Sequence, residues 1–179
     1  MDQNFTRSVL SWYDAGHRDL PWRRTKDAYR IWVSEIMLQQ TRAETVVSYY
    51  ERFLARYPDV RALADAPEEE LLKAWEGLGY YSRARLLQKA ARAIVSQYGG
   101  ELPADLKKLR ALPGVGDYTS GAIASIAFGI PAAAVDGNVE RVICRYFAIS
   151  EEMGSPKSRR MIHELAQSLV PPDRPGAFA

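Results

Sequence analysis

The sequence predicts an all-α fold, and three observations lead to that prediction. Apolar residues recur at spacings of three and four along most of the 179 residues, as at Val46, Tyr50 and Phe53. No stretch alternates with a period of two, and no Asn-Gly pair joins two apolar runs. Helix-ending residues stand between the periodic stretches, with Pro58 and Gly99-Gly100 as examples.

The periodicity and these breaks together place the individual helices. Pro67 lies in a first turn, and Pro131 interrupts the connection that follows a strongly apolar helix. The helices that we expect cover residues 4–16, 29–40, 43–57, 67–75, 82–98, 105–110, 117–128, 137–148 and 156–170.

Composition limits the class of protein. Hydrophobic residues make up 47% and charged residues 26%, which is a globular balance and excludes disordered and collagen-like chains. No uncharged apolar run approaches the ~18–20 residues of a membrane helix, and the first residues lack a secretory signal pattern. The single cysteine, Cys144, excludes an internal disulfide and a thiolate cluster built from these residues alone. We therefore expect an intracellular protein without a membrane partner.

Charge permits a nucleic-acid partner without requiring one. The 24 basic and 22 acidic residues give a net charge of only +2. Basic residues nevertheless gather in four segments, each next to a predicted turn. These segments are residues 18–30, 83–92, 107–110 and 157–160. For any one cluster taken alone, a solvated helix face is the favoured explanation, so the decision falls to motifs.

The segment Leu112–Gly116 reads Leu-Pro-Gly-Val-Gly between a short predicted helix and an apolar one. Two glycines one residue apart allow positive φ and close approach of backbone N–H groups to a partner. The following helix N-terminus adds partial positive charge, so the loop suits a phosphate oxygen. An ordinary helix–helix turn is the alternative for the glycines alone. The full motif favours the hairpin of helix–hairpin–helix DNA-binding proteins.

Two carboxylates are candidates for acid–base chemistry. Glu35 lies within the apolar run from Val33 to Leu38, where burial would raise its pKa and prepare a general acid. The alternative is a solvent-facing helix residue. Asp136 follows a small apolar run and precedes a helix, so an ordinary helix N-cap is its alternative role.

Two further segments suit contacts to DNA. Gln39-Gln40 ends a predicted helix with two long amides, which can hydrogen-bond base edges. Residues 75–85 combine glycines, paired tyrosines and arginines, which suits a loop that stacks on bases and holds phosphates. A buried aromatic turn is the alternative for this loop.

Taken together, the chain resembles the MutY-type adenine DNA glycosylases of the helix–hairpin–helix glycosylase superfamily. The matching segments occur in family order over essentially the whole chain, from about Phe5 to Phe178. They are Leu20-Pro21-Trp22, Ser34-Glu35 through Thr41, Gly77–Tyr81, Leu112–Gly116 and Val135–Val139.

The resemblance implies an all-α, two-lobed fold. A six-helix barrel would span residues 26–135, with the helix–hairpin–helix motif near 105–128. The second lobe would combine residues 1–25 with residues 136–179. The active site would lie in the cleft between the lobes.

The resemblance also implies roles for individual residues. The family flips adenine, mispaired with 8-oxoguanine or guanine, out of the duplex and hydrolyses its N-glycosidic bond. Glu35 would protonate adenine N7, and Asp136 would stabilise an oxocarbenium ion, with Asn138 and Tyr118 completing the catalytic set. The adenine pocket would comprise Arg18, Trp22, Arg23 and Leu38. The DNA contacts would be Gln39, Gln40, Thr41, Gly79, Tyr80, Tyr81, Arg83, Leu112, Pro113, Gly114, Val115 and Gly116.

Family members that also cleave the DNA backbone carry a lysine at the position of Tyr118. A Schiff base needs an amine, so we expect a monofunctional glycosylase. Most members continue into four cysteines that bind a [4Fe-4S] cluster. This sequence has only Cys144, so we expect no metal within it and a longer parent chain.

The expected partner is double-stranded DNA with A:8-oxoG or A:G mismatches, bound by a monomer; in a bacterium the setting would be the cytoplasm, at the nucleoid. Two alternatives remain. One is a pyrimidine-mismatch glycosylase, against which Glu35 argues because pyrimidines lack N7. The other is a non-catalytic helix–hairpin–helix DNA-binding fragment.

Overall fold

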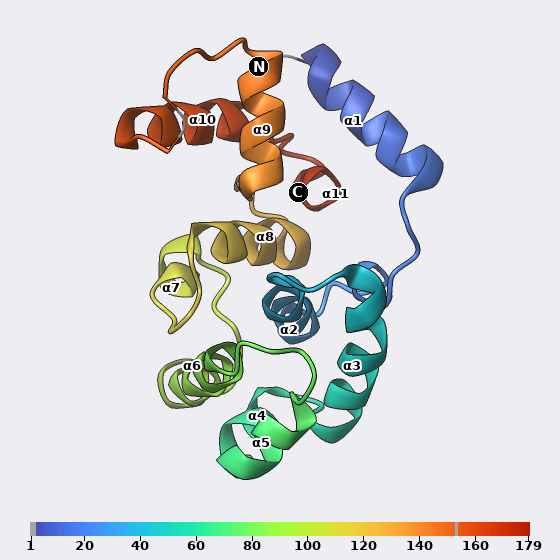
Figure 1. Ribbon diagram of the computed structural model, residues 1–179, viewed down its shortest axis with the longest axis vertical. Coiled ribbons are helices and arrows are strands. Elements are labelled where there is room, and N and C mark those ends of the chain that lie inside the picture. The colour runs from blue at the N-terminus through green and yellow to red at the C-terminus, as the bar shows by residue number, and fades with distance from the viewer. Residues whose placement is uncertain (1–2, 153) are drawn as a thin grey trace.

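The computed structural model describes residues 3–152 and 154–179, and every regular element within those ranges is helical. The all-α prediction is therefore confirmed. The helices form two groups stacked along the long axis of the molecule (Figure 1). One group contains α2 to α8, and the other contains α1, α9, α10 and α11. None of the described helices has the length and apolar character that crossing a membrane demands.

The bounds of the helices agree closely with the predicted ranges. The long elements are α1 (Gln3–Gly16), α2 (Ala28–Leu38), α3 (Ala43–Arg56), α6 (Ser82–Tyr98), α8 (Asp117–Phe128), α9 (Gly137–Tyr146) and α10 (Pro156–Leu169). The short elements are η1 (Pro21–Arg23, a 3₁₀ turn), α4 (Val60–Asp65), α5 (Glu68–Ala74), α7 (Leu106–Arg110) and α11 (Pro175–Phe178).

The structure corrects the predicted helices in two ways. It adds η1, α4 and α11, which are too short for a 3.6-residue periodicity to be visible. It also ends two helices early. Helix α2 stops at Leu38 instead of residue 40, because the backbone of Gln39 is extended (ψ 112°) and Gln40 then has a φ of 59°. Helix α9 stops at Tyr146 instead of residue 148, because Ala148 has a φ of 49°.

Each group of helices has its own hydrophobic core. Trp32, Phe53 and Trp75 are among the buried residues of the larger core. Ile143, Ile162 and Leu169 belong to the smaller core, which α9 and α10 share. In the connection between α8 and α9, Ala132 still belongs to the larger core and Ala133 already belongs to the smaller one. The predicted lobe limits, residues 26–135 against 1–25 with 136–179, remain a prediction, and Trp22 packs into the larger core.

The connection from α8 to α9 is held tightly to both groups. A Cβ atom on Gly121 of α8 would lie 2.2 Å from the carbonyl oxygen of Ala133. The Ser125 hydroxyl donates to the Ala132 carbonyl at 2.5 Å. From α10, the Gln167 side chain accepts from the Ala133 amide at 2.9 Å and donates to the Pro131 carbonyl at 3.0 Å. This close approach fixes the backbone three residues before Asp136.

Gly121→Ala is expected to lower the free energy of unfolding by about 1–3 kcal/mol, because the added methyl group overlaps the Ala133 carbonyl and forces backbone to move. Urea denaturation measures the change. Gly137→Ala is the matched control, because no atom lies within 4 Å of a Cβ placed there. Equal stability of the two variants would contradict the close contact at Gly121.

Candidate active site

Glu35 projects from α2, the helix at the centre of the larger core. The Asp27 carboxylate caps this helix by accepting from the Arg30 amide at 2.8 Å. Seven consecutive residues, 31–37, are buried, because α3, α6 and α8 all pack against this helix. Glu35 is among them, with 7% of its surface exposed. The solvent-facing alternative for Glu35 is therefore excluded.

The surroundings of the Glu35 carboxyl favour its neutral form. The pKa of Glu35 is raised to about 7, mainly by burial and to a smaller extent by the nearby charge of Asp136. A hydrogen bond from the Tyr118 hydroxyl opposes this rise. Its Oε2 atom is buried without a hydrogen-bond partner among the described residues. Glu35 can thus hold a proton near neutral pH and has an oxygen available to present it.

Asp136 caps α9 and is held as an acceptor. Its Oδ1 accepts from the backbone amides of Asn138 and Val139 at 2.9 and 2.8 Å. Its Oδ2 accepts from the Asn138 side-chain amide at 3.0 Å. Arg141 donates to the other end of that amide at 3.1 Å, which fixes its orientation. The N-cap role foreseen as the alternative is real, and the same carboxylate still acts electrostatically on Glu35 and Tyr118.

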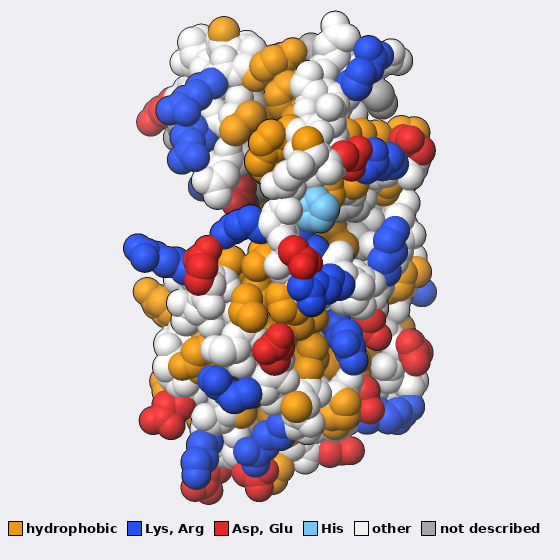
Figure 2. Space-filling view, turned by 90° about the vertical axis from the view of Figure 1, so that its right-hand side faces the viewer, with side chains coloured by type: hydrophobic (Ala, Val, Ile, Leu, Met, Phe, Trp, Pro, Cys, Tyr) orange, Lys and Arg blue, Asp and Glu red, His pale blue; other side chains and the backbone are white. Residues whose placement is uncertain are grey.

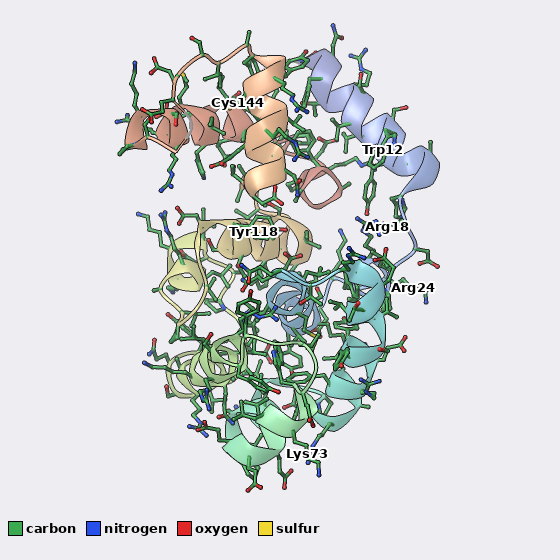
Figure 3. The ribbon with its side chains drawn as sticks, viewed as in Figure 1. Trp12, Arg18, Arg24, Lys73, Tyr118 and Cys144 are labelled. Carbon is green, nitrogen blue, oxygen red and sulfur yellow. The ribbon has the colours of Figure 1, made fainter. Side chains whose placement is uncertain are left out.

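Tyr118 links the two carboxyl groups. It lies in the first turn of α8, in the middle of the molecule (Figure 3). Burial, and then the charge of Glu35, raise the pKa of its hydroxyl, so the phenol stays protonated. A neutral phenol can donate to a carboxylate but has no amine with which to form a Schiff base.

A pocket of about 650 Å3 opens onto the Glu35 carboxyl. The predicted residues Trp22, Arg23, Leu38 and Tyr118 line it. Asp136 does not line the pocket. Its charge raises the pKa values of Glu35 and Tyr118, which do. On the face with α1 and α3, Figure 2 shows a hollow between the two groups of helices, with Lys and Arg side chains on its rim.

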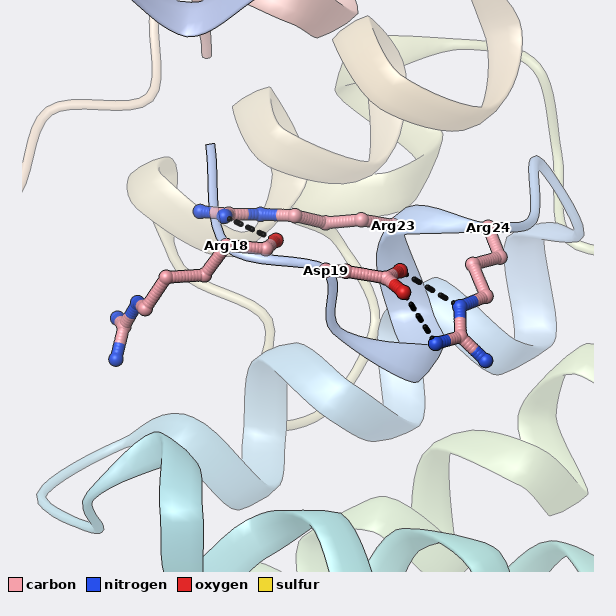
Figure 4. Close-up of polar contacts among 4 residues, drawn as sticks. All are labelled: Arg18, Asp19, Arg23 and Arg24. Carbon is pink, nitrogen blue, oxygen red and sulfur yellow. Dashed lines mark hydrogen bonds and ion pairs between the residues drawn. The ribbon is translucent and has the colours of Figure 1, made fainter. Parts of the chain in front are cut away.

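Arg18, predicted to form part of the pocket wall, is not among the residues that line this pocket. Its guanidinium turns away and donates to Glu44 of α3 at 2.7 Å, while its backbone carbonyl accepts from Arg23 at 2.9 Å (Figure 4). In the same segment, the Arg24 guanidinium donates two hydrogen bonds to the Asp19 carboxylate, at 2.7 and 2.5 Å. Arg18 thus holds Arg23 at the pocket through its backbone instead of lining the pocket.

The two predicted DNA-contacting turns are both exposed. Gln40 and Tyr80 have positive φ values of 59° and 46°, and the Tyr80 side chain is 64% exposed. Tyr81 is also exposed, and Gly79 takes a φ of 69°. These positions leave side chains free to meet a partner.

Other predicted residues of these turns make internal contacts. The Gln39 amide donates to Thr119 at 3.5 Å, and the Thr41 hydroxyl to the Gln39 carbonyl at 3.4 Å. Arg83 was predicted to contact DNA. In the structure its guanidinium is instead buried among backbone carbonyls and does not face outward.

The hairpin between α7 and α8 has the expected form, with one correction. Leu112 and Val115 are buried and anchor it, and Pro113 is partly buried between them. Gly114 has a φ of 73°, and a Cβ there would lie 2.9 Å from Leu86. Gly116, in contrast, has a φ of −91°, so positive φ is needed only once. Within the described ranges, the Gly114 and Gly116 amides have no protein acceptor.

Sequence reasoning missed part of the pocket. Tyr13, Arg24, Lys26 and Arg174 also line it, together with residues of α11. The Arg174 guanidinium donates to Asp14 of α1 at 2.9 and 2.6 Å, which joins the two ends of the described chain. No motif marks these residues, since exposed arginines next to a Pro-Gly turn occur in many proteins. Only the fold brings α1 and α11 together.

The residues of this chain do not fit a four-cysteine cluster. Cys144 is the only cysteine in the sequence, and it lies on α9, partly buried within the smaller core (Figure 3). No group of three or more potential metal ligands occurs among the described residues.

Residues 33–172 match the HhH-GPD superfamily of base excision DNA repair proteins. The chain is 50% identical over 183 residues to the adenine DNA glycosylase of Homo sapiens, covering 97% of this chain and 34% of that protein. It is 38% identical to an adenine DNA glycosylase of Buchnera aphidicola subsp. Baizongia pistaciae, covering 93% of this chain and 47% of that protein. The chain thus spans about a third to a half of these curated relatives.

Solved structures resemble the whole described fold. A thermostable thymine-DNA glycosylase superposes with a TM-score of 0.91 at 37% identity, covering 98% of this chain and 81% of that one. A trapped endonuclease III–DNA covalent intermediate gives a TM-score of 0.79 at 25% identity, covering 97% and 78% of the two chains.

Glu35→Gln is expected to stabilise the fold above neutral pH. The pKa of Glu35 is about 7 in the folded chain against an ordinary 4.5, so the folded state holds the proton more tightly and stability falls as pH rises between these values. At pH 8 the variant should gain about 3–4 kcal/mol in free energy of unfolding, at ~1.4 kcal/mol per pKa unit. At pH 4 the gain should vanish.

Chemical denaturation at both pH values checks this, with Glu164→Gln on the exposed face of α10 as control. A gain that is the same at pH 4 and pH 8 would show that the Glu35 carboxyl ionises without penalty.

Proposed function

The chain belongs to the HhH-GPD superfamily of base excision DNA repair proteins, and we propose that it is a DNA glycosylase that hydrolyses the bond between adenine and its deoxyribose. The substrate is double-stranded DNA in which adenine is mispaired with 8-oxoguanine or guanine. One observation carries the proposal. A protonatable Glu35 lines a pocket large enough to hold a base, and a second, anchored carboxylate, Asp136, acts on its charge.

The two carboxyl groups divide the chemistry between them. A base in a duplex is inaccessible, so the adenine leaves the stack and enters the pocket. Glu35 gives its proton to N7, which makes adenine a neutral leaving group as the bond from N9 to C1′ breaks. The bonding electrons leave with the base, and the sugar becomes an oxocarbenium ion. Asp136 remains negative beside it and stabilises that charge.

Water completes the reaction by adding its oxygen to C1′. The Glu35 carboxylate, left after the first step, can accept the proton that this water releases, which restores the acid. Tyr118 hydrogen-bonds Glu35, and Asn138 keeps the Asp136 carboxylate in place with a 3.0 Å hydrogen bond. Trp22, Arg23 and Leu38 supply one wall of the pocket against the flipped base.

The two exposed turns and the hairpin supply the grip on DNA. Gln40 and Tyr80 project from turns with strained backbones and are suited to enter the base stack where adenine has left. The amides of Gly114 and Gly116 lie ahead of the N-terminus of α8, where a phosphate oxygen is stabilised. This grip positions the duplex, while the pocket selects the base.

A thymine substrate is the second candidate, because the similar thermostable structure is a thymine-DNA glycosylase. Thymine has no N7 for Glu35 to protonate, and this favours adenine. A panel of duplexes with a G:T or an A:8-oxoG pair decides between them: thymine release without adenine release would replace the proposal. Salt-dependent duplex binding without release of either base would leave the non-catalytic module.

The rate of adenine release should depend on both carboxyl groups and on pH. Glu35→Gln and Asp136→Asn should each slow single-turnover release by about 10²–10⁴-fold, the usual contribution of a positioned acid. In the wild-type chain the rate should fall as pH rises above about 7, where Glu35 loses its proton. Glu164→Gln is the control with unchanged rate. Robust release by Asp136→Asn would remove that residue from the mechanism.

Borohydride should trap no covalent complex with DNA during base release, because Tyr118 offers no amine for a Schiff base. Gel electrophoresis after reduction reads out the adduct. Lys26 also borders the pocket, so Lys26→Ala identifies the source if an adduct forms. An adduct in stoichiometric yield would contradict the monofunctional reaction.

A further inference from the structure

The turns that carry Gln40 and Tyr80 lie side by side although they are forty residues apart in sequence. Both turns contain a non-glycine residue with left-handed backbone, a conformation that is strained for residues with a side chain. Such conformations persist only where the surroundings hold them. One side chain, Arg83, contacts both turns.

Arg83 begins in the first turns of α6 and passes between the two turns. Its Nη1 donates to carbonyls at the end of α2, and its Nη2 to carbonyls of the turn before α6. The acceptors are the backbone oxygens of Ile36 (2.9 Å), Met37 (3.2 Å), Gln39, Leu78 (2.8 Å) and Gly79 (3.2 Å), with the Thr41 hydroxyl at 3.5 Å. One guanidinium thus bonds to both turns.

The chemistry of these contacts requires arginine. The guanidinium is a planar fork of donors, whereas lysine offers a single point charge. The acceptors on the α2 side are carbonyls at a helix C-terminus, where the partial charge is negative. The faces of Trp75 and Tyr80 lie 5.5 and 5.8 Å from the guanidinium carbon and add cation–π attraction.

A buried cation without an acidic partner is costly, which points to a specific role. Arg83 is only 8% exposed, and no ion pair among the described residues includes it. Burial accordingly lowers the pKa of its guanidinium. An apolar side chain at this position would avoid the desolvation cost but would remove the one donor group that the carbonyls of both turns share. The Gln39 and Gly79 carbonyls would then keep only their local donors, Thr41 and Trp75.

We propose that Arg83 is a positioning residue, which fastens the turn at residues 39–41 to the turn at residues 78–80 so that Gln40 and Tyr80 enter the DNA stack as one rigid edge. Entry into DNA rests on the proposed function. The link between the two turns rests on the hydrogen bonds alone. Arg83 contacts neither the base nor the phosphates in this role.

Hydrogen exchange tests the fastening without any substrate. In Arg83→Gln, amide exchange in peptides covering residues 39–42 and 77–81 should accelerate together, by about tenfold or more, since each 1.4 kcal/mol of lost local stability is a factor of ten. The rest of the chain should keep its protection.

The matched control for this experiment is Arg92→Gln on the same helix, since Arg92 also donates to a carbonyl, that of Ala64 at 3.0 Å, far from both turns. Acceleration in one turn only, or uniform acceleration throughout the chain, would overturn the proposal.

Base release tests what the fastening is for. Arg83→Gln should slow single-turnover adenine release from a mismatched duplex by about tenfold or more, an effect of ~1.4 kcal/mol. Release from the same sequence as a single strand should change less than about twofold, because no stack must be opened there. Arg83→Lys should recover little of the duplex rate, because an ammonium cannot reach both sets of carbonyls.

An equal loss on duplex and single strand would assign Arg83 to general stability and overturn the proposal. If the wild-type chain releases adenine from neither substrate, the proposed function fails, and the exchange experiment still decides whether Arg83 joins the two turns.

Discussion

The burial of the Glu35 carboxyl beside Tyr118 and Asp136 is the interaction on which the rest of the structure depends. Glu35 comes from the central helix of the larger core, and Asp136 caps a helix of the smaller one. The chain reaches that cap only because Gly121 lets α8 approach the Ala133 backbone. The packing of both groups of helices therefore sets the environment of one acid. A carboxyl in that environment reduces the stability of the fold near neutral pH, which is a common cost of a functional site.

Under the proposed function, recognition of a base and the hold on its strand would come from different parts of the chain. The pocket joins α2 and α8 to the segment around η1 and to α11. The hairpin amides and the turns with Gln40 and Tyr80 lie on other elements. Arg83 connects two of these parts through backbone carbonyls. In the proposed mechanism, such an arrangement would separate the residues that open a duplex from those that do the chemistry.

The sequence predicted what is local or carried by a motif. Long helices such as α6 are visible in their periodicity, and the motif at Leu112–Gly116 does form the hairpin. The sequence did not predict the positions of side chains that tertiary contacts determine. Arg18 and Arg83 look alike as exposed basic residues, yet one pairs with Glu44 and the other is buried. The part of the pocket formed by Tyr13 and Arg174 depends on the meeting of α1 and α11, which no local pattern encodes.

The most direct test of the account is a titration of Glu35 itself. Carbon-13 NMR of the chain labelled at glutamate side-chain carboxyls, with Glu35→Gln to assign the signal, would follow its ionisation. The account predicts a midpoint near pH 7, and a higher midpoint in Tyr118→Phe, because the Tyr118 hydrogen bond lowers the pKa of Glu35. A midpoint near the ordinary value of 4.5 would contradict it, since Glu35 would then carry no proton to deliver at neutral pH.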